Sequence, residues 1–523
     1  LMLFSTTLDL IQVSDIHGYV AGQKRQPQFA DFSNLVSYVD RAKQQNPTLF
    51  SIVGDLCDGT LFSDASEPRC ANMVALVSKS NVDVFTPGNH DLYFDETVSL
   101  LKKLPLVTSN VVYKNGSVLF QKLLQINASL RVLIVGFTVD NNYESVVAKS
   151  VSELFDDGFK TIIKELVLKN DFLVVLMHQT FSHSQTKEFY QEIKQIQKEL
   201  GHQFPFVMQT AHGHQQYANY CYKDKSCYMV EAGKYLQYLQ HTRITFAQTT
   251  YEYKNQTYKG VQFDKIDKIF SGPFYLHKFN GKPGICDVFN VQNIDTPNGA
   301  KISKFVKEVQ QQTHSDVKIA DLKFTLRKYQ DNFMQNDSIL NYFVNVVVKS
   351  TFKGSCSCFT QMGVGSIRSD LQKGLVDLED LHQVYPFSNK MLFIHNLTLN
   401  QSNCLAQELK SPRYMVGKPE GECQDFVFSD HDESFVQQAM EKCQIQRGVQ
   451  QYGNMTYEQA FQETVVKTFG IQRFERFNTA FILGAIASVL VIIYLIFITI
   501  ALSSKAKKGG YRKIQNHEEM TYT

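Results

Sequence analysis

The sequence predicts an α/β fold made of two domains, followed by one membrane-spanning helix. Three observations lead to this prediction. Residues 8 to about 275 alternate short apolar runs with helix-like stretches, which is typical of a layered α/β domain. A less periodic region follows a polar segment at 290–299 and indicates a second, α+β domain. An uncharged apolar run over 480–502 is long enough to cross a bilayer as a helix.

The composition agrees with this organisation. The chain has 523 residues, of which 43% are hydrophobic and 20% charged, so it can bury sizeable cores. A net charge of +2 gives no indication of a nucleic-acid polymer as a partner. We expect a first domain over 1–285, a linker and interdomain helix over 286–312, a second domain over 313–472, a membrane helix over 478–502 and a tail over 503–523.

The first domain is expected to alternate strands and helices in chain order. The strands are the short apolar runs Leu8–Val13, Leu49–Val53, Val82–Phe85, Val132–Val135, Phe172–Met177, Phe206–Met208 and Met229–Val230. The helices are the stretches with helical periodicity at Phe32–Gln45, Thr97–Leu104, Phe159–Lys169 and Thr186–Leu200. A further helix-like stretch, Lys301–Gln312, follows the polar segment that separates the two domains.

Polar residues that can bind metal follow five of these runs. They are Asp15, His17, Asp55, Asn89, His90, Asp91, His178, His212 and His214. Each motif alone is weak evidence, because a Gly-Asp pair is usually only a turn and Asn-His-Asp can simply cap a helix. Ligands of open α/β sheets gather at the carboxyl ends of the strands. Together, these residues therefore predict one shared site.

The residue types indicate a centre with two metals. Two divalent ions about 3.5–4 Å apart can activate a water and hold both oxygens of an in-line phosphoryl displacement. A carboxylate is needed to bridge two adjacent cations, and imidazoles suit zinc, iron or manganese. The amide oxygen of Asn89 is a neutral ligand that leaves its metal a strong Lewis acid. We therefore expect two divalent metal ions as cofactors.

The motifs Val-Ser-Asp15-Ile-His17-Gly, Val-Gly-Asp55, Pro-Gly-Asn89-His90-Asp91, Leu-Met-His178 and Ala-His212-Gly-His214 resemble the calcineurin-like metallophosphoesterase superfamily. The resemblance covers roughly residues 8–239 and implies a four-layer α/β/β/α domain. It implies that one metal is held by Asp15, His17 and His214, the other by Asn89, His178 and His212, with Asp55 bridging. It also implies that His90 stabilises the transition state or protonates the leaving oxygen, and that Asp91 orients His90.

The second domain carries two motifs of its own. Gly365-Ser-Ile-Arg368-Ser-Asp-Leu-x-x-Gly374 and Tyr385-Pro-Phe387-Ser-Asn389 resemble the C-terminal domain of the 5′-nucleotidases, in particular a fungal and protist branch. The resemblance implies that Arg368 contacts a phosphate and that Phe387 stacks on a base. The residues alone also allow an arginine paired with a nearby acid and a phenylalanine in the core.

Three features predict that both domains lie outside the cytosol. Lysines and an arginine follow the apolar run, which places that end in the cytosol and predicts a type I, single-pass protein. All ten cysteines precede the run, as expected for disulfides, and Cys221 with Cys227 would close a short loop. Sequons for glycosylation occur at Asn115, Asn127, Asn255, Asn336, Asn396, Asn400 and Asn454. The expected location is the cell surface or an endosomal, lysosomal or vacuolar membrane.

We expect a dinuclear-metal, 5′-nucleotidase-like ecto-enzyme that releases phosphate from nucleotides. One alternative is a phosphodiesterase or nucleotide-diphosphate hydrolase that uses the same site. The other is a catalytically silent membrane scaffold with the same fold. Gly484 and Ser488 are spaced for close helix approach, which makes a homodimer a further expectation.

Overall fold

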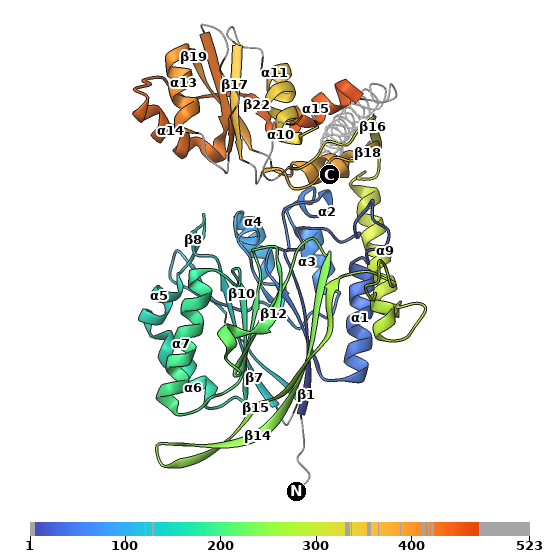
Figure 1. Ribbon diagram of the computed structural model, residues 1–523, viewed down its shortest axis with the longest axis vertical. Coiled ribbons are helices and arrows are strands. Elements are labelled where there is room, and N and C mark those ends of the chain that lie inside the picture. The colour runs from blue at the N-terminus through green and yellow to red at the C-terminus, as the bar shows by residue number, and fades with distance from the viewer. Residues whose placement is uncertain are drawn as a thin grey trace, which may run out of the picture.

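The computed structural model describes residues 6–469 except 121, 128–129, 330–334, 336, 353–356, 364–365, 388, 410–413, 417–418 and 420–422 (Figure 1). The expected membrane helix over 478–502, the tail over 503–523 and the Gly484 and Ser488 pair lie outside these residues. Within the described part of the chain, no helix combines the length and apolar character that crossing a bilayer requires.

Two β-sheets packed face to face form the centre of the first domain. The first sheet has the order β15-β14-β1-β2-β3, with β1 (Thr6–Ser14), β2 (Thr48–Val53), β3 (Val84–Thr86), β14 (Tyr238–Tyr253) and β15 (Gln256–Pro273). The second has the order β12-β13-β11-β10-β7-β6, with β6 (Lys122–Asn127), β7 (Leu130–Thr138), β10 (Phe172–His178), β11 (Phe206–Thr210), β12 (Gln216–Tyr220) and β13 (Cys227–Ala232).

Alternating side chains of the strands build both faces of this sandwich. In β1, Leu8 and Leu10 are in the core between the sheets, whereas Ile11 and Val13 pack with the helices outside. The two-residue period of a strand explains this division, since successive side chains point to opposite faces. In β10, likewise, Val174 packs in the core between the sheets, whereas Leu173 packs with the helices outside.

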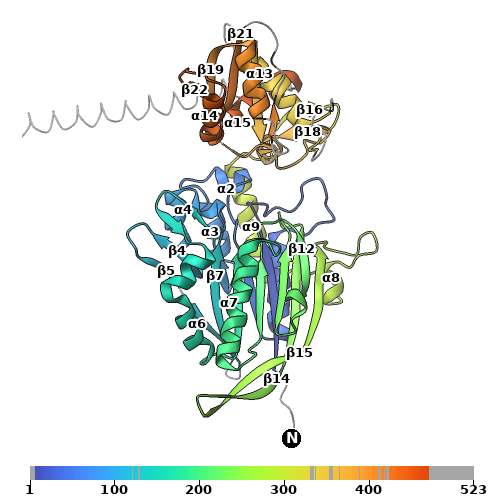
Figure 2. The same ribbon diagram turned by 60° about the vertical axis from the view of Figure 1, so that its left-hand side comes forward.

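Helices cover both outer faces, so the domain has the expected four layers (Figures 1 and 2). The first sheet is covered by α1 (Phe32–Gln45), α3 (Ala71–Ser78) and α9 (Pro297–Gln312), and the second by α5 (Val151–Leu154), α6 (Lys160–Val167) and α7 (Ser184–Leu200). Shorter elements complete the domain: α2 (Leu61–Asp64), η1 (His90–Leu92), α4 (Asp95–Leu101), η2 (Phe155–Phe159), η3 (Cys221–Lys223) and α8 (Ile285–Val288). A small sheet, β5-β4-β9-β8, comprises β4 (Thr108–Tyr113), β5 (Val118–Phe120), β8 (Asn141–Asn142) and β9 (Val146–Ala148).

Several elements of the first domain and of the linker differ from the sequence-based expectation, among them α9 and the β14–β15 hairpin. The helix expected from Lys301 begins at Pro297, because the Thr296 side chain caps the backbone N–H of Gly299 and proline suits the first helical turn. The hairpin of β14 and β15 was not expected at all. Its strands span 16 and 18 residues, and much of their surface is partly exposed, so they lack the short apolar runs that mark the buried strands.

The second domain is an α+β unit, as expected. Its sheet has the order β20-β17-β21-β19-β22, with β17 (Ser357–Gly363), β19 (Lys390–Thr398), β20 (Tyr414–Val416), β21 (Cys423–Ser429) and β22 (Gln450–Thr456). A two-stranded sheet pairs β16 (Lys318–Leu322) with β18 (Gly374–Asp377). The helical elements are α10 (Ile339–Tyr342), η4 (Phe343–Val347), α11 (Val348–Thr351), α12 (Leu378–Val384), α13 (Leu399–Glu408), η6 (Asp430–Asp432), α14 (Glu433–Lys442) and α15 (Tyr457–Phe469).

Three disulfides are present among the described residues. They join Cys57 to Cys70, Cys221 to Cys227, and Cys404 to Cys443. The expected pairing of Cys221 with Cys227 is therefore confirmed. The Cys57–Cys70 bond closes a loop that leaves the end of β2 and leads to the domain boundary.

Charged residues join the two domains across this boundary. Arg25 of the first domain lies 3.0 Å from Asp380 of the second. The ring of His382 bridges both domains, because its Nε2 lies 2.8 Å from Asp64 and its Nδ1 lies 2.6 Å from Glu458. These contacts hold the second domain over the carboxyl ends of the strands.

The stability of the protein is expected to depend on pH through His382. Burial lowers the pKa of this ring, but its hydrogen bonds to Asp64 and Glu458 outweigh burial and raise the pKa to about 10. A free histidine has a pKa of about 6.5. The stabilisation that His382 contributes to the folded state is therefore fully present below that pH and is lost as the pH rises through about 10.

Denaturant titrations should show the free energy of unfolding falling between pH 7 and 10. His382→Gln should cost about 3 kcal/mol at pH 7, as expected when one partner of a buried ion pair is removed, and should flatten the pH dependence. His395→Gln removes an exposed ring paired with Asp425 and serves as the control. An unchanged pH dependence in His382→Gln would show that His382 does not carry this stabilisation.

Candidate metal centre

The expected metal ligands meet at the carboxyl ends of β1, β2, β3, β10 and β11. Six of the seven form two groups in which the candidate ligand atoms lie within 4.8 Å of one another. One group is Asp15, His17, Asp55 and His214, and the other is Asp55, His178 and His212. Asp55 belongs to both groups, which is the position that a bridging carboxylate requires.

Sharp turns direct these side chains toward one point. The backbone φ is positive at Asp15 (49°), His17 (49°), Asp55 (50°), His212 (68°) and His214 (59°). Residues other than glycine rarely adopt this left-handed conformation, and the strain is retained where surrounding structure enforces it, often at functional sites. The turns therefore indicate that the backbone is held in place to converge these ligands.

Two glycines allow the turns to approach one another. A Cβ at Gly54 would lie 2.2 Å from Nδ1 of His178, and a Cβ at Gly88 would lie 2.2 Å from Oδ1 of Asp55. No side chain fits at either position without moving a ligand. The glycines that precede Asp55 and Asn89 in the sequence motifs are therefore required by close packing of the ligands themselves.

Hydrogen bonds fix the orientation of two histidine rings. Nδ1 of His17 lies 2.9 Å from the carbonyl oxygen of Asp58, and Nδ1 of His178 lies 3.0 Å from that of Val53. A carbonyl only accepts, so each Nδ1 carries a proton and Nε2 is the ring nitrogen that is left to face a metal. Both Nε2 atoms are buried and have no hydrogen-bond partner.

The amide of Asn89 is oriented in the same way. Its Nδ2 donates to the Tyr93 hydroxyl at 2.7 Å, whereas its Oδ1 is buried without a partner. An unpaired buried acceptor costs free energy, so acceptors gathered at one point indicate a cation. With the carboxylates of Asp15 and Asp55, these atoms fit the oxygen and nitrogen ligands that divalent zinc, iron or manganese takes.

Electrostatics in the centre favour neutral ligating rings and positive charge beside Asp55. Burial lowers the pKa of His17 to about 3 and that of His212 to about 4, so these rings are neutral near pH 7. Burial also acts on His178, but the Asp55 carboxylate outweighs it and raises the pKa of that ring to about 10. Nε2 of His178 lies 3.2 Å from Oδ2 of Asp55.

His90 lies beside the ligands and contacts both domains. Its backbone N–H donates to Asp55, and its Nδ1 lies 2.6 Å from Oδ2 of Asp58. Its Nε2 lies 3.1 Å from Nη2 of Arg368, which belongs to the second domain. A guanidinium only donates, so Nε2 accepts and the ring proton sits on Nδ1 facing Asp58.

The expectation that Asp91 orients the His90 ring is wrong, because Asp58 holds that ring. Asp91 instead accepts the backbone N–H groups of Leu56, Cys57 and Gly88, each through a contact of 2.9–3.0 Å. These bonds join the turn that carries Asp55 to the turn that carries Asn89. Asp91 is therefore a positioning residue for the ligand turns.

Asp58 was missed in the sequence, although it lies only three residues after Asp55. Its carbonyl holds His17, its carboxylate holds His90, and its backbone φ is 72°. Arg69 forms an ion pair with it, and the Cys57–Cys70 disulfide encloses both residues. The only signal in the sequence was a second aspartate shortly after the Gly-Asp turn. Neither helical nor strand periodicity distinguishes such a residue from an ordinary aspartate in a loop.

The two expected substrate residues of the second domain also lie at this centre. The Arg368 guanidinium lies 5.0 Å from the centroid of the Phe387 ring, and that ring lies 6.5 Å from the ring of His90. Phe387 packs partly against the core of the second domain. The structure therefore brings residues of both domains to one face of the site.

Comparisons with known proteins agree with this architecture. Residues 8–218 match the family described as calcineurin-like phosphoesterase, and residues 325–468 match the C-terminal domain of NAD nucleotidase. The chain is 21% identical over 425 residues to an uncharacterized protein of Saccharomyces cerevisiae, covering 74% of this chain and 67% of that protein. It is 20% identical over 456 residues to a secreted protein of Arthroderma benhamiae, covering 78% and 68%.

Two solved structures share the fold at low sequence identity. The 5′-nucleotidase from Candida albicans has a TM-score of 0.72 at 17% identity, covering 88% of this chain and 98% of that chain. The 5′-nucleotidase precursor from Thermus thermophilus has a TM-score of 0.62 at 13% identity, covering 88% and 97%. Both show the fold of this chain.

Two substitutions should separate metal binding from the role of His90. Asn89→Ala removes an expected ligand, so bound metal measured by elemental analysis should fall and phosphate release should be lost. Asp58→Asn leaves the ligand side chains in place, so metal content should be retained. Its kcat should fall by about 10²–10⁴-fold, the usual contribution of a positioned acid or base.

Asp95→Asn, an exposed change in α4, is the control and should alter neither quantity. Full activity in Asn89→Ala would contradict the ligand assignment. Loss of metal in Asp58→Asn would show that Asp58 supports the ligands rather than His90.

Proposed function

Because the chain combines a calcineurin-like phosphoesterase domain with a C-terminal domain of the NAD nucleotidase type, we propose that it releases phosphate from nucleotides. The observation that carries this proposal is the meeting of metal ligands from the first domain with Arg368 and Phe387 from the second. A site built from both domains can bind a phosphoryl group and the rest of a nucleotide at once. The 5′-nucleotidase fold supports this substrate class.

The residues divide the chemistry among them. One divalent ion would be held by Asp15, His17 and His214. The other would be held by Asn89, His178 and His212, and Asp55 would bind both ions. When bound, such ions activate water and neutralise charge on the phosphoryl group. Arg368 presents a planar set of donors to phosphoryl oxygens, and Phe387 offers a ring face to a base.

His90 is placed to act on the oxygen that leaves phosphorus. Asp58 holds its Nδ1, which directs Nε2 toward the side of the site where Arg368 lies. A phosphoryl group that replaces this direct contact would accept from the guanidinium, and it would accept from Nε2 when the ring is an imidazolium that carries protons on both nitrogens. The buried surroundings strengthen these charge interactions relative to water.

Phosphate release should be measured with adenosine monophosphate, a nucleoside diphosphate sugar, cyclic adenosine monophosphate and an aryl phosphate, each with zinc, manganese or iron. We expect release from the monophosphate, since its terminal phosphate can reach the metals while the base reaches Phe387. Preference for the cyclic compound would favour the phosphodiesterase alternative. No release from any compound, with fewer than one metal per chain, would favour a scaffold.

We further propose that both domains face the outside of the cell or an organelle lumen, anchored by residues 478–502. Disulfides in the described part of the chain support an oxidising compartment. The sequons at Asn115 and Asn255 lie in exposed turns, at the tips of the β4–β5 and β14–β15 hairpins, where glycans can be accommodated.

Treatment with an endoglycosidase should therefore lower the apparent mass of the full chain from its native membranes. Asn255→Gln should remove one step of this shift, and Asn290→Gln, which destroys no sequon, should leave it unchanged. A chain whose mass does not respond would place the domains on the cytosolic side.

A further inference from the structure

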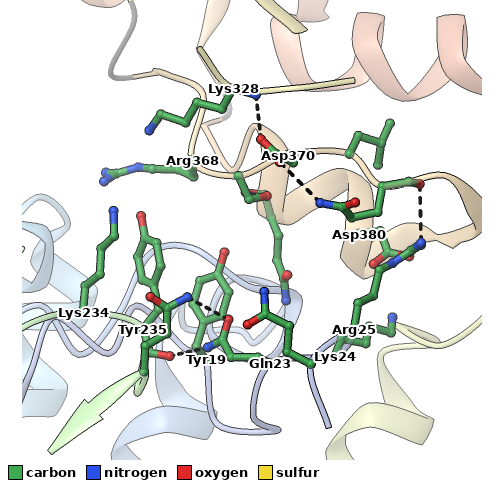
Figure 3. Close-up of a pocket in the computed structure, with 16 residues that line it drawn as sticks. Tyr19, Gln23, Lys24, Arg25, Lys234, Tyr235, Lys328, Arg368, Asp370 and Asp380 are labelled. Carbon is green, nitrogen blue, oxygen red and sulfur yellow. Dashed lines mark hydrogen bonds and ion pairs between the residues drawn. The ribbon is translucent and has the colours of Figure 1, made fainter. Parts of the chain in front are cut away.

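A pocket of about 310 Å³ opens beside the metal centre where the two domains meet (Figure 3). Its walls include Tyr19, Lys234 and Tyr235 of the first domain, and Lys328 and Arg368 of the second. Arg368 also contacts His90, since its Nη2 lies 3.1 Å from Nε2 of that ring. The pocket is therefore continuous with the catalytic face through Arg368.

Three cationic side chains converge in this pocket. Figure 3 shows the charged ends of Lys234, Lys328 and Arg368 together on one side of the pocket. Burial, together with the positive charges of Lys234 and Arg368, lowers the pKa of Lys328 to about 8. Burial and Arg368 also lower the pKa of Lys234. Cations placed so close together repel one another unless an anion lies between them.

The acids of the pocket do not serve as that anion. Asp370 accepts the backbone N–H of Lys328 at 2.7 Å, and Asp380 pairs with Arg25 at 3.0 Å. Across the described residues, neither Lys234 nor Lys328 has a carboxylate within ion-pairing distance. Asp370 and Asp15 act to raise the pKa of Lys328 and of Lys234, but burial and the neighbouring cations outweigh them, so both ammonium groups keep donors for an external anion.

A buried hydroxyl adds a neutral donor to these cations. The rings of Tyr19 and Tyr235 are stacked with centroids 4.4 Å apart, and they form one wall of the pocket. Tyr19 is 6% exposed, and its hydroxyl has no hydrogen-bond partner. A tyrosine hydroxyl is a donor near neutral pH, so it can donate to an anion in the pocket.

We propose that Lys234 and Lys328 bind a second phosphate next to the one that is hydrolysed, so that the preferred substrate is a nucleoside diphosphate. This inference rests on the proposed function. Arg368 contacts His90 and also lines the pocket of the two lysines, which suits two phosphates joined by one bridging oxygen. Phosphate is the anion that several convergent lysine, arginine and hydroxyl donors recognise.

The reaction balances as a hydrolysis of the phosphoanhydride. The oxygen of water bonds to the terminal phosphorus, and the bond from that phosphorus to the bridging oxygen breaks. The bridging oxygen keeps the electron pair and leaves as part of the nucleoside monophosphate, whose phosphate stays with the lysines. One proton of the water remains on the released phosphate, and the other passes to solvent.

The test compares adenosine diphosphate, adenosine monophosphate and adenosine 3′,5′-bisphosphate on the full-length, metal-loaded protein. In the wild type, kcat/KM should be highest for the diphosphate. The double variant Lys234→Met/Lys328→Met should lower it at least 30-fold for the diphosphate and less than threefold for the monophosphate. Lys323→Met removes an exposed lysine of the second domain and should change neither value.

Binding of the non-hydrolysable α,β-methylene analogue of the diphosphate gives a readout besides turnover. Calorimetry should show at least a tenfold higher Kd in the double variant and an unchanged Kd for the monophosphate. Equal losses for both nucleotides, or a wild-type preference for the monophosphate or the bisphosphate, would overturn the inference while leaving the proposed function intact. If no nucleotide is hydrolysed, the proposed function fails, and calorimetry still decides whether the lysines bind a diphosphate.

Discussion

The buried carboxylate of Asp55 is the constraint around which the first domain is arranged. It belongs to both ligand groups and lies within 3.5 Å of ring nitrogens from two histidines. A buried carboxylate is costly unless cations or hydrogen bonds compensate for it. Gly88 makes room for its Oδ1, and the backbone of His90 donates to it. The left-handed turns around it are the geometric consequence of bringing five strand ends to this one group.

A second arrangement of charges connects this centre to the other domain. Asp58 holds His90 and pairs with Arg69, which lies 3.1 Å from Asp64, and Asp64 in turn contacts His382. The disulfide between Cys57 and Cys70 closes the loop that carries Asp58, Asp64 and Arg69. The orientation of the His90 ring and the position of the second domain therefore depend on the same short loop. Arg368 and Phe387 of the second domain lie beside His90 of the first.

Much of the site could be predicted from the sequence because its ligands follow buried strands directly. Short apolar runs mark those strands, and the C-terminal ends of parallel strands meet at one edge. The long hairpin was missed because it is only partly buried and has no such apolar runs. Asp91 was assigned to the His90 ring because it is the next residue in the chain, whereas Asp58, which holds the ring, lies 32 positions away. Only the hydrogen bonds show which carboxylate meets the ring and which meets the backbone.

By itself, the sequence determined the ligand types, their order along the chain and the strands that carry them, since these follow from local periodicity and residue chemistry. It also contained the second-domain motif with Arg368 and Phe387. Only the tertiary structure decided that Arg368 contacts His90, and that Lys234 and Lys328 line one pocket at the domain boundary. Arg368 and His90 are separated by 278 positions in the chain, and no local sequence pattern shows which distant side chains share a pocket. Such contacts depend on how the two domains pack, which is set by buried surface and paired charges rather than by spacing along the chain.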